Sequence, residues 1–364
     1  MVTVKAPALQ EFVGEIFLKS GCSVEESRRI AKYLVAANLT GHDSHGVIRV
    51  PRYVQMKADG LVVADRKVEV LIDTPAIAVV DGLYGFGQTV APQAVDIGIA
   101  KCRANGLSAV ALRNAGHVGR VGDWAEMAAQ AALVSVHFVN AAGSVLVAPF
   151  AGVDRRFSTA PFCVGIPRPD ADPVILDFAT SVVAEGKVLV ASRGGKKLPA
   201  DALVGPDGTI GGDPHLLYGD YEPGGGERDY GEGLGAIRAF GEHKGSGLAL
   251  ICELLGGALS GTGATRENRR FANGMLSFYV DPKRMDPQAA FSGEVARYLA
   301  AVKSSRPVQK GGEVLTPGEP ERRLRAERLA GGVPLTDDTW ASIVATARQV
   351  GVDERRVQAV ARSD

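Results

Sequence analysis

The sequence has few cysteines, and their positions exclude two kinds of framework. Only four cysteines occur among the 364 residues, and no two of them form a Cys-x-x-Cys pair. Disulfide-rich secreted domains and structural zinc sites need closer or more numerous cysteines. We therefore expect a cytoplasmic protein whose cysteines are buried as small apolar side chains. These residues are Cys22, Cys102, Cys163 and Cys252.

An excess of one charge and a long apolar run are also absent. Lys plus Arg number 41 and Asp plus Glu number 41, so the formal net charge is zero. Nucleic-acid and membrane-surface proteins usually carry a basic excess. No run of about 18 apolar residues indicates a transmembrane helix, and the first residues show no signal-peptide pattern. We expect neither a nucleic acid nor a membrane as a partner.

The common phosphate-binding fingerprints are missing too. Neither Gly-x-Gly-x-x-Gly nor a Gly-Lys-Ser/Thr loop occurs, which disfavours an ordinary Rossmann site. The best phosphate candidate is His243-Lys-Gly-Ser-Gly247, because a lysine and small residues precede an apolar helix there. Free N–H groups and the helix dipole favour an anion at such a start. A lysine-bearing turn before a core helix is the alternative.

Apolar periodicity predicts helices near both ends and a strand-rich middle. The length suits two or three domains. Between 140 and 280 strands outnumber helices, which indicates a mixed sheet, while 205–235 reads as a long loop. Helices are predicted over 7–19, from a capping box at Ser23 towards Leu39, over 89–104, over 121–132, from Thr180 or Ser181, over 248–259 and after Thr336; strands are predicted over 68–72, 77–80, 107–112, 133–139, 174–178 and 274–280.

The segment around His45 carries the most chemical information. His45, Arg49 and Tyr53 follow one another at intervals of four residues, with Ser44 beside the histidine. An imidazole passes a proton near neutral pH, and a guanidinium binds a carboxylate with two hydrogen bonds. Only a continuous helix places the three on one stripe, but Pro51 either kinks that helix or starts a new one. A structural ion or hydrogen-bond site is the alternative.

Two further observations bear on the histidines. His117 lies in Gly116-His-Val-Gly119, between a predicted strand and a predicted helix, where flanking glycines allow close approach of another group. A histidine satisfied in a turn is the alternative. His42 and His45 lack a third metal ligand, so no metal is expected. Adjacent Ser44 and His45 side chains normally diverge, which disfavours hydrolase chemistry. His137, inside an apolar strand, is predicted to be a core histidine.

These motifs, taken in order, resemble the malate/L-lactate dehydrogenase family of non-Rossmann NAD(P)-dependent oxidoreductases. Its relatives include ureidoglycolate dehydrogenase, diketogulonate reductase, sulfolactate dehydrogenase and piperideine-2-carboxylate reductase. The resemblance covers about residues 10 to 350. The matching pieces are Asp43-Ser-His-Gly-Val with Arg49, Pro51 and Tyr53; Arg113-Asn-Ala-Gly-His-Val-Gly119; Asp177-Phe-Ala-Thr-Ser181 with Gly186-Lys187; His243-Lys-Gly-Ser-Gly-Leu-Ala-Leu250; and Pro317-Gly-Glu319.

The resemblance implies a fold and a division of the chain. The fold would be α/β (α+β), with a non-Rossmann NAD(P)-binding domain on a largely antiparallel mixed sheet and helical N- and C-terminal segments. A substrate and dimer segment over 1–75 would join residues 311–364, an α/β segment would cover 76–130, and the cofactor domain would cover 131–310. The family also implies a homodimer with its active site near the subunit interface.

The resemblance also implies an activity and site residues. The expected reaction is hydride transfer between NAD or NADP and a small 2-hydroxy or 2-keto acid. A reductase of a cyclic imino acid and a non-catalytic dinucleotide- or organic-acid-binding protein are the alternatives. The implied acid/base candidates are His45 and His117; the substrate residues are Ser44, Arg49, Tyr53 and Thr159; the cofactor residues are Asp177, Phe178, Ala179, His243, Lys244, Gly245, Pro317, Gly318 and Glu319.

Three departures from the family pattern concern the substrate and the preference for NAD or NADP. The family often has Thr-Asn-Pro where this chain has Thr159-Ala-Pro161, so an amide is missing there. The usual Pro-x-Gly-Trp stretch appears as Pro199-Ala-Asp-Ala202, and the loop at 219–235 is longer and richer in glycine than expected. None of these departures affects the histidines, but the sequence leaves the identity of the acid and the choice between NAD and NADP open.

Overall fold

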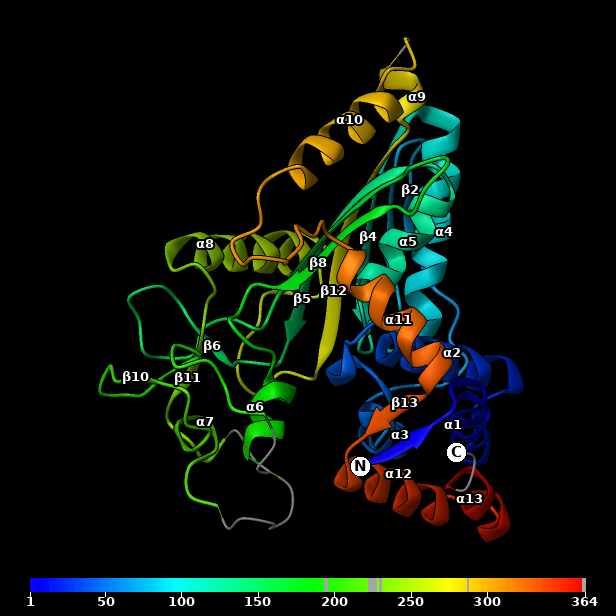
Figure 1. Ribbon diagram of the computed structural model, residues 1–364. Coiled ribbons are helices and arrows are strands. Elements are labelled where there is room, and N and C mark those ends of the chain that lie inside the picture. Colours follow the sequence, from blue (N-terminus) through cyan, green and yellow to red (C-terminus); the bar gives the residue numbers. More distant parts are fainter. Residues whose placement is uncertain (193–195, 222–227, 229–230, 287, 362–364) are drawn as a thin grey trace.

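A seven-stranded sheet forms the centre of the computed structural model (Figure 1). The structure describes residues 1–192, 196–221, 228, 231–286 and 288–361. Within these residues every neighbouring pair in this sheet is antiparallel except β3 with β4. The predicted largely antiparallel mixed sheet is therefore confirmed. In spatial order the strands are β2 (Glu69–Asp73), β3 (Ile77–Asp81), β4 (Leu107–Ala115), β12 (Ala272–Val280), β5 (Val134–Ala142), β7 (Pro161–Ile166) and β8 (Val174–Ala179).

Helices cover both faces of this sheet. On one face lie α4 (Gly87–Asn105) and α5 (Gly122–Gln130); on the other lies α8 (His243–Cys252), which continues as the π-helix η3 (Glu253–Leu259) (Figure 1). A Cβ at Gly256 would lie 2.7 Å from the Phe138 carbonyl oxygen. The helix can therefore pack directly on the backbone of β5.

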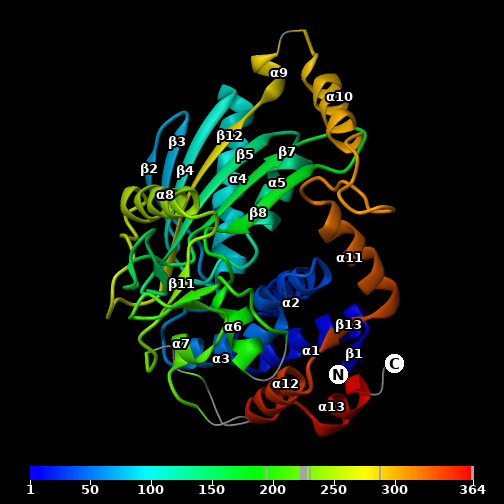
Figure 2. The same cartoon turned by 60° about the vertical axis from the view of Figure 1, so that its left-hand side comes forward.

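The two ends of the chain share one hydrophobic core. Buried side chains of the N-terminal helices pack with those of the C-terminal helices, and both ends of the chain lie on the same side of the molecule (Figure 2). The N-terminal and C-terminal segments thus pack together, as the proposed division of the chain requires. The residue limits of the domains stay a prediction. The elements are β1 (Val2–Val4), α1 (Ala6–Lys19), α2 (Val24–Leu39), α3 (Val50–Ala58), β13 (Val333–Leu335), α12 (Asp337–Gln349) and α13 (Glu354–Ala361).

The predicted caps are confirmed in part. Ser23 caps α2 by accepting from the Glu26 N–H, and Thr336 caps α12 in the same way. The reciprocal hydrogen bond of the predicted capping box, from the Ser23 N–H to the Glu26 side chain, is not formed, so that part of the prediction is wrong. The Glu26 carboxylate accepts from Thr89 and from the Asp65 backbone, while the Ser23 N–H donates to the Asp65 carboxylate. Burial of Glu26 against α4 redirects its side chain.

Residues 145–240 contain a second, smaller sheet. The prediction of one long loop over 205–235 is wrong for the described part of that range, because one short strand and one helix occur there; residues 222–227, 229 and 230 lie outside the described residues. The helix predicted from Thr180 starts at Glu185, since Ser181 and Val182 still pair with β11. The elements are β6 (Val147–Ala148), α6 (Glu185–Ser192), β9 (Leu203–Val204), β10 (Ile210–Gly211), α7 (His215–Tyr218) and β11 (Ala236–Arg238).

Besides α13, three more helices in the C-terminal part of the described chain were not predicted. They are α9 (Pro282–Met285), α10 (Phe291–Lys303) and α11 (Glu319–Gly331), and none of them has a fully buried residue. The apolar residues of α10 recur at helical spacing as regularly as those of the predicted helix α2, so the sequence contained a signal for α10 that was overlooked. Among the described residues, no helix is long and apolar enough to cross a membrane. All four cysteines are free and buried, as expected.

His137 is a core histidine, as predicted. It has no exposed surface, and its ring nitrogens pair with the Ser277 and Ser135 hydroxyls at 2.8 and 3.0 Å. Burial lowers the pKa of His137 from 6.5 to about 3. The unfolded chain therefore takes up this proton first as the pH falls, so the stabilisation is complete above about pH 6.5 and is lost towards pH 3.

Replacing His137 by Asn tests this linkage. We expect the difference in unfolding free energy between the wild type and His137→Asn to be about 2 kcal/mol smaller at pH 5 than at pH 7. Urea titrations at both pH values measure this difference. His215→Asn, at an exposed histidine, is the matched control and should parallel the wild type. An equal difference at both pH values would contradict the assignment.

Candidate active site

The segment after α2 is not a continuous helix. It forms two 3₁₀ turns, η1 (Asp43–His45) and η2 (Val47–Arg49), before α3 begins at Val50. Pro51 lies in the first turn of α3, where its missing N–H leaves no helical hydrogen bond unmade. The single helical stripe is therefore wrong, and the alternative of a helix that starts at the proline is right.

Asn38 fixes the shape of this segment. Its side-chain amide donates to Asp43 at 2.7 Å and accepts from the Val47 N–H at 2.8 Å. A Cβ at Gly46 would lie 2.2 Å from the Asn38 amide oxygen, so only glycine fits there. Arg328 of α11 pairs with the Asp43 carboxylate at 2.6 Å and also donates to the Asn38 carbonyl. Residues of α2 and α11, from the N-terminal and C-terminal segments of the chain, thus hold the turn that carries His45.

His117 lies in the loop between β4 and α5, where the sequence placed it. The loop is held by hydrogen bonds from the Gly116 N–H to the Gly85 carbonyl and from the Val118 N–H to the Asn273 side chain, both 2.8 Å. A Cβ at Gly116 would approach that Gly85 oxygen to 2.7 Å. The glycine beside the histidine therefore permits the close approach that the motif predicted.

The tertiary fold brings the two histidines together. Their ring centroids are 5.4 Å apart with 20° between the planes. The Tyr53 hydroxyl is 2.5 Å from Nδ1 of His117, and the Ser44 hydroxyl is 3.0 Å from Nδ1 of His45. Among the described residues neither Nε2 atom has a hydrogen-bond partner. Both histidines therefore have one ring nitrogen oriented by a hydroxyl and one available for a substrate.

Arg49 lies beside this pair with its charge uncompensated. Its Nε donates to the Ser44 carbonyl at 2.6 Å. Within the described ranges of the chain, no carboxylate forms an ion pair with it. A Cβ at Gly186 of α6 would lie 2.9 Å from Cβ of Ser44 and 3.9 Å from Nη2 of Arg49, so a glycine keeps this wall of the site open. A half-buried, unpaired guanidinium is suited to an anionic ligand.

The electrostatics of the site favour neutral histidines. Burial, His117 and Arg49 lower the pKa of His45 well below its ordinary value, and burial and Arg49 lower the pKa of His117 to about 3. Burial raises the pKa of Tyr53 to about 12. At pH 7 both imidazoles are therefore uncharged and the phenol keeps its proton, so the Arg49 charge is available to a substrate carboxylate.

The residues of β8 point to opposite faces of the sheet. Asp177 accepts from the Gly122 N–H at 2.7 Å on the α5 side. The ring of Phe178 instead packs against Phe240 on the α8 side, with centroids 5.3 Å apart. Ala179 ends the strand opposite Pro161. Strand alternation therefore separates Asp177 from Phe178, and no one surface of this chain presents all the predicted cofactor residues.

His243, Lys244 and Gly245 form the first turn of α8. A Cβ at Gly245 would lie 2.0 Å from the Phe240 carbonyl oxygen, so glycine is required at that position. His243 and Lys244 are exposed, and no side chain of the described residues caps the helix. This uncapped start with a lysine suits a phosphate group.

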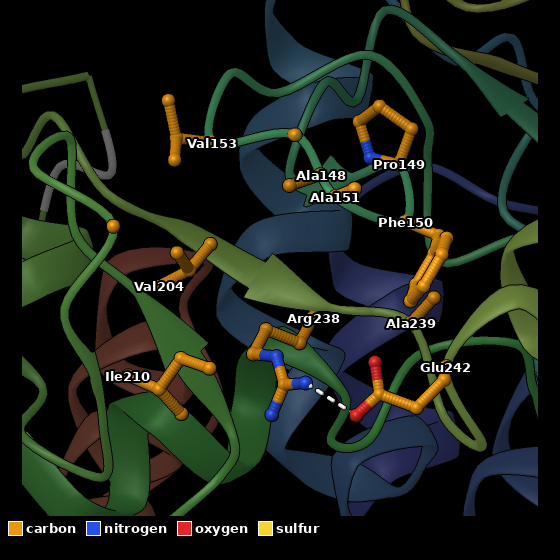
Figure 3. A pocket seen from close by; sticks show the side chains of 12 residues that line it. Ala148, Pro149, Phe150, Ala151, Val153, Val204, Ile210, Arg238, Ala239 and Glu242 are labelled. Atoms are coloured by element: carbon orange, nitrogen blue, oxygen red, sulfur yellow. Dashed lines mark hydrogen bonds and ion pairs between the residues drawn. The ribbon is translucent and has the colours of Figure 1, made fainter.

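A cavity of about 230 Å³ adjoins this helix start (Figure 3). Phe150 lines it and packs against the ring of His243 with centroids 5.9 Å apart. Arg238 and Glu242 also line the cavity and form an ion pair at 2.7 Å. Whole-ligand pockets measure about 300–1,000 Å³, so the cavity has room for one end of a larger ligand.

The remaining predicted residues lie elsewhere. Gly318, with φ +91°, packs on the backbone of Ile175 in β8, and Glu319 accepts from the Thr316 N–H at 2.9 Å and from Lys303 at 2.5 Å. The Lys303 ammonium lowers the pKa of Glu319 to about 2. The Thr159 carbonyl accepts from the Thr180 N–H near the end of β8. Pro317-Gly-Glu319 is thus a well-held turn on the edge of the sheet.

The structure brings some predicted residues together and reveals two that the sequence reasoning missed. Ser44, His45, Arg49, Tyr53 and His117 form one cluster. The missed residues are Asn38 and Gln88, each at most 2% exposed. The sequence feature that could have identified them is a single amide residue at the end or the start of an apolar helix. A buried amide at such a position forms hydrogen bonds with backbone or functional groups.

The chain is similar to known dehydrogenases along its whole length. The family model described as malate/L-lactate dehydrogenase matches residues 4–344. Hydroxycarboxylate dehydrogenase B of Escherichia coli strain K12 is 37% identical over 360 residues, which is 97% of this chain and 96% of the relative. A Pseudomonas putida Delta(1)-pyrroline-2-carboxylate/Delta(1)-piperideine-2-carboxylate reductase is 30% identical and covers 93% and 94%. A solved Escherichia coli structure of malate/lactate dehydrogenase type matches with a TM-score of 0.90 at 36% identity, covering 99% and 98%.

Proposed function

This chain belongs to the malate/L-lactate dehydrogenase family, and we propose that its His45–His117 cluster is the active site for hydride exchange between a nicotinamide cofactor and a small 2-hydroxy or 2-keto acid. The observation that carries this proposal is the unpaired Arg49 beside two neutral, stacked imidazoles. The family and its named relatives support an oxidoreductase, not a binding protein without turnover.

The chain's own residues would orient the acid and move its proton. Arg49 would bind the carboxylate through its free guanidinium nitrogens, which places the neighbouring carbon and its oxygen at the histidines. In oxidation a histidine of the pair accepts the hydroxyl proton as the C–H hydride leaves; in reduction it returns a proton to the carbonyl oxygen. When bound, the nicotinamide ring accepts or supplies the hydride.

The residues of α8 and its neighbouring cavity fit a dinucleotide. His243 and Lys244 would hold phosphate oxygens at the uncapped helix start. The adjoining cavity would take the adenosine end. Glu242 lines this cavity and neutralises Arg238, so we propose a preference for NAD, since a carboxylate accepts from ribose hydroxyls but repels a 2′-phosphate. The cofactor roles proposed from the resemblance are kept for Asp177, Phe178, Ala179 and Pro317-Gly-Glu319. Because Asp177 and Phe178 point to opposite faces of the sheet, the two side chains cannot both contact the cofactor on one surface of a single chain.

Absorbance of the reduced nicotinamide tests the function. NADH and NADPH would each be mixed with the protein and with pyruvate, oxaloacetate, 2-ketoglutarate, diketogulonate, sulfopyruvate or piperideine-2-carboxylate. Oxidation of NADH with a keto acid is the expected result. Oxidation with the cyclic imine alone would identify an imine reductase, as the Pseudomonas putida relative is named. If neither NADH nor NADPH were oxidised with any of these compounds, although binding of the cofactor was measurable, the proposed substrate class would be contradicted.

The outer face of α8 supports a homodimer. Leu250, Ile251, Leu254 and Leu259 are 41–64% exposed on α8 and η3, although the opposite face of the same helix packs on the sheet. A helix that is apolar on every side is normally buried, and a contiguous apolar face marks a protein contact. We therefore propose that a second copy of the chain covers this face.

A charge on this face should separate the subunits. We expect Leu254→Asp to be a monomer at micromolar concentration, because an aspartate at an apolar interface is desolvated without a partner. Size-exclusion chromatography with light scattering measures the mass. Leu18→Asp places the same charge on α1 at a leucine of similar exposure, 43% against 46%, and should stay dimeric. A dimeric Leu254→Asp would rule out this face as the interface.

A further inference from the structure

Gln88, in the first turn of α4, forms the second layer of the active site. Its Nε2 donates to the Tyr53 hydroxyl oxygen at 3.2 Å, and that hydroxyl lies 2.5 Å from Nδ1 of His117. Gln88 and Tyr53 are 1% and 4% exposed. The three side chains therefore form a hydrogen-bonded chain that ends at a ring nitrogen of a proposed catalytic histidine.

Two glycines make room for this chain. A Cβ at Gly87 would lie 2.2 Å from the His117 carbonyl oxygen, so the start of α4 abuts the histidine loop directly. Gly119 has φ +72°, and a Cβ there would come within 3.0 Å of Nε2 of Gln88. The second glycine of Gly116-His-Val-Gly119 thus accommodates the glutamine amide.

Counting donors and acceptors fixes the direction of each hydrogen bond. A phenol has one hydrogen, and within the described residues the Tyr53 hydroxyl has only two partners, Gln88 and His117. Because Gln88 donates, the hydroxyl hydrogen has His117 as its only acceptor. The reverse amide orientation would leave both N–H groups of Gln88 without partners, whereas the observed one leaves Oε1 and one N–H unpaired among the described residues. Unpaired buried carbonyl oxygens are the commoner case.

We infer that Gln88 is a positioning residue that directs the Tyr53 hydrogen to Nδ1 of His117 and so holds this histidine as the neutral tautomer with its proton on Nε2. The titratable and charged groups that face His117 are His45 from η1, Arg49 from η2 and Tyr53 from α3. None of them is an anion, so nothing on these elements favours the imidazolium form.

The fixed tautomer separates the roles of the two histidines. With a proton on Nε2, His117 donates a hydrogen bond to the substrate oxygen and stabilises charge that develops there. Among the described residues, Nδ1 of His45 pairs with the Ser44 hydroxyl alone, and this hydroxyl can accept as well as donate. His45 can therefore carry or release a proton at Nε2, so it is the proton carrier. This division of roles rests on the proposed function, whereas the position of the proton on His117 does not.

Nitrogen-15 spectra of histidine-labelled protein test the tautomer directly. In the wild type at pH 7 we expect the His117 signals, assigned with His117→Gln, to show a protonated Nε2 and a bare Nδ1. In Gln88→Met, which keeps the length of the side chain but removes the amide, we expect a mixture of tautomers. Tyr53→Phe should have the same effect. Gln93→Met, on the same helix and bonded to Thr89 and Arg66 backbone carbonyls, is the matched control and should leave His117 unchanged.

Two results would overturn the inference. A wild-type His117 with its proton on Nδ1 would do so, and so would an unchanged tautomer in both Gln88→Met and Tyr53→Phe. In turnover we expect Gln88→Met to lower kcat about 10–100-fold, by analogy with the residues that orient metal-bound histidines, with the KM for cofactor unchanged. An unchanged kcat despite the altered tautomer would overturn the catalytic role. A wild type inactive with every acid would refute the proposed function but leave the spectra interpretable.

Discussion

Replacing His45 by Gln is expected to lower kcat for hydroxy-acid oxidation about 10²–10⁴-fold, the range that general acid–base catalysis supplies. Glutamine keeps the approximate size and a hydrogen-bonding group next to Ser44, but it cannot accept a proton. The stacked partner His117 does not compensate, because its Nδ1 accepts from Tyr53 and its Nε2 already carries hydrogen. Stopped-flow and steady-state absorbance of the reduced cofactor measure this change.

Two measurements separate loss of chemistry from loss of structure. The dissociation constant for NADH, measured by fluorescence, should be unchanged in His45→Gln, because His45 lies in η1, not at the start of α8. His215→Gln, at an exposed histidine in α7, should have the wild-type kcat. If His45→Gln turned over at nearly the wild-type rate, His45 would not be the proton carrier.

Removing the charge of Arg49 should act mainly on the substrate. Truncating one partner of a buried, hydrogen-bonded charge pair costs about 2–5 kcal/mol, so we expect Arg49→Gln to lower kcat/KM for a 2-keto acid roughly 30- to 5,000-fold. The kcat/KM of Arg49→Lys should lie between those of the wild type and Arg49→Gln, since lysine keeps the charge but not the planar pair of donors. Steady-state kinetics with saturating NADH measure the effect.

Arg49 should also influence the pH profile. Its charge contributes to the lowered pKa values of His45 and His117. Without it both pKa values should rise, so the acidic limb of kcat/KM, where the base becomes protonated, should move to higher pH. Arg49→Lys should move the limb less. A wild-type KM for the acid in Arg49→Gln would mean that the carboxylate binds elsewhere.

Much of the site was predictable from short stretches of sequence. The spacing of His45, Arg49 and Tyr53 and the glycines around His117 reflect local needs: a turn, a helix start at Pro51 and a close backbone approach. The strand-rich middle of the chain was predictable because apolar strands are local patterns, whereas the largely antiparallel arrangement of the sheet was implied by the family resemblance. The buried cysteines and the core position of His137 followed from composition and pattern alone.

The errors in the prediction have a common cause. The continuous helix through His45 and the closed capping box at Ser23 are both wrong, because side chains distant in sequence compete for the same groups. Asn38 and Arg328 hold the His45 turn, and Asp65 occupies the Ser23 N–H. Propensity within a window of residues contains no information about such partners, since tertiary contacts routinely override it.

The sequence by itself determined which chemical groups are present and the family to which they belong, because residue identity and order along the chain define both. Only the tertiary structure decided how these groups meet. Three separate segments bring His45, His117 and Gln88 into one cluster, in which Tyr53 links Gln88 to His117. Strand alternation turns Asp177 and Phe178 to opposite faces of one sheet. The physical reason is that hydrogen-bond direction, ring stacking and burial depend on distances between residues far apart in the chain, and packing of the whole fold sets those distances.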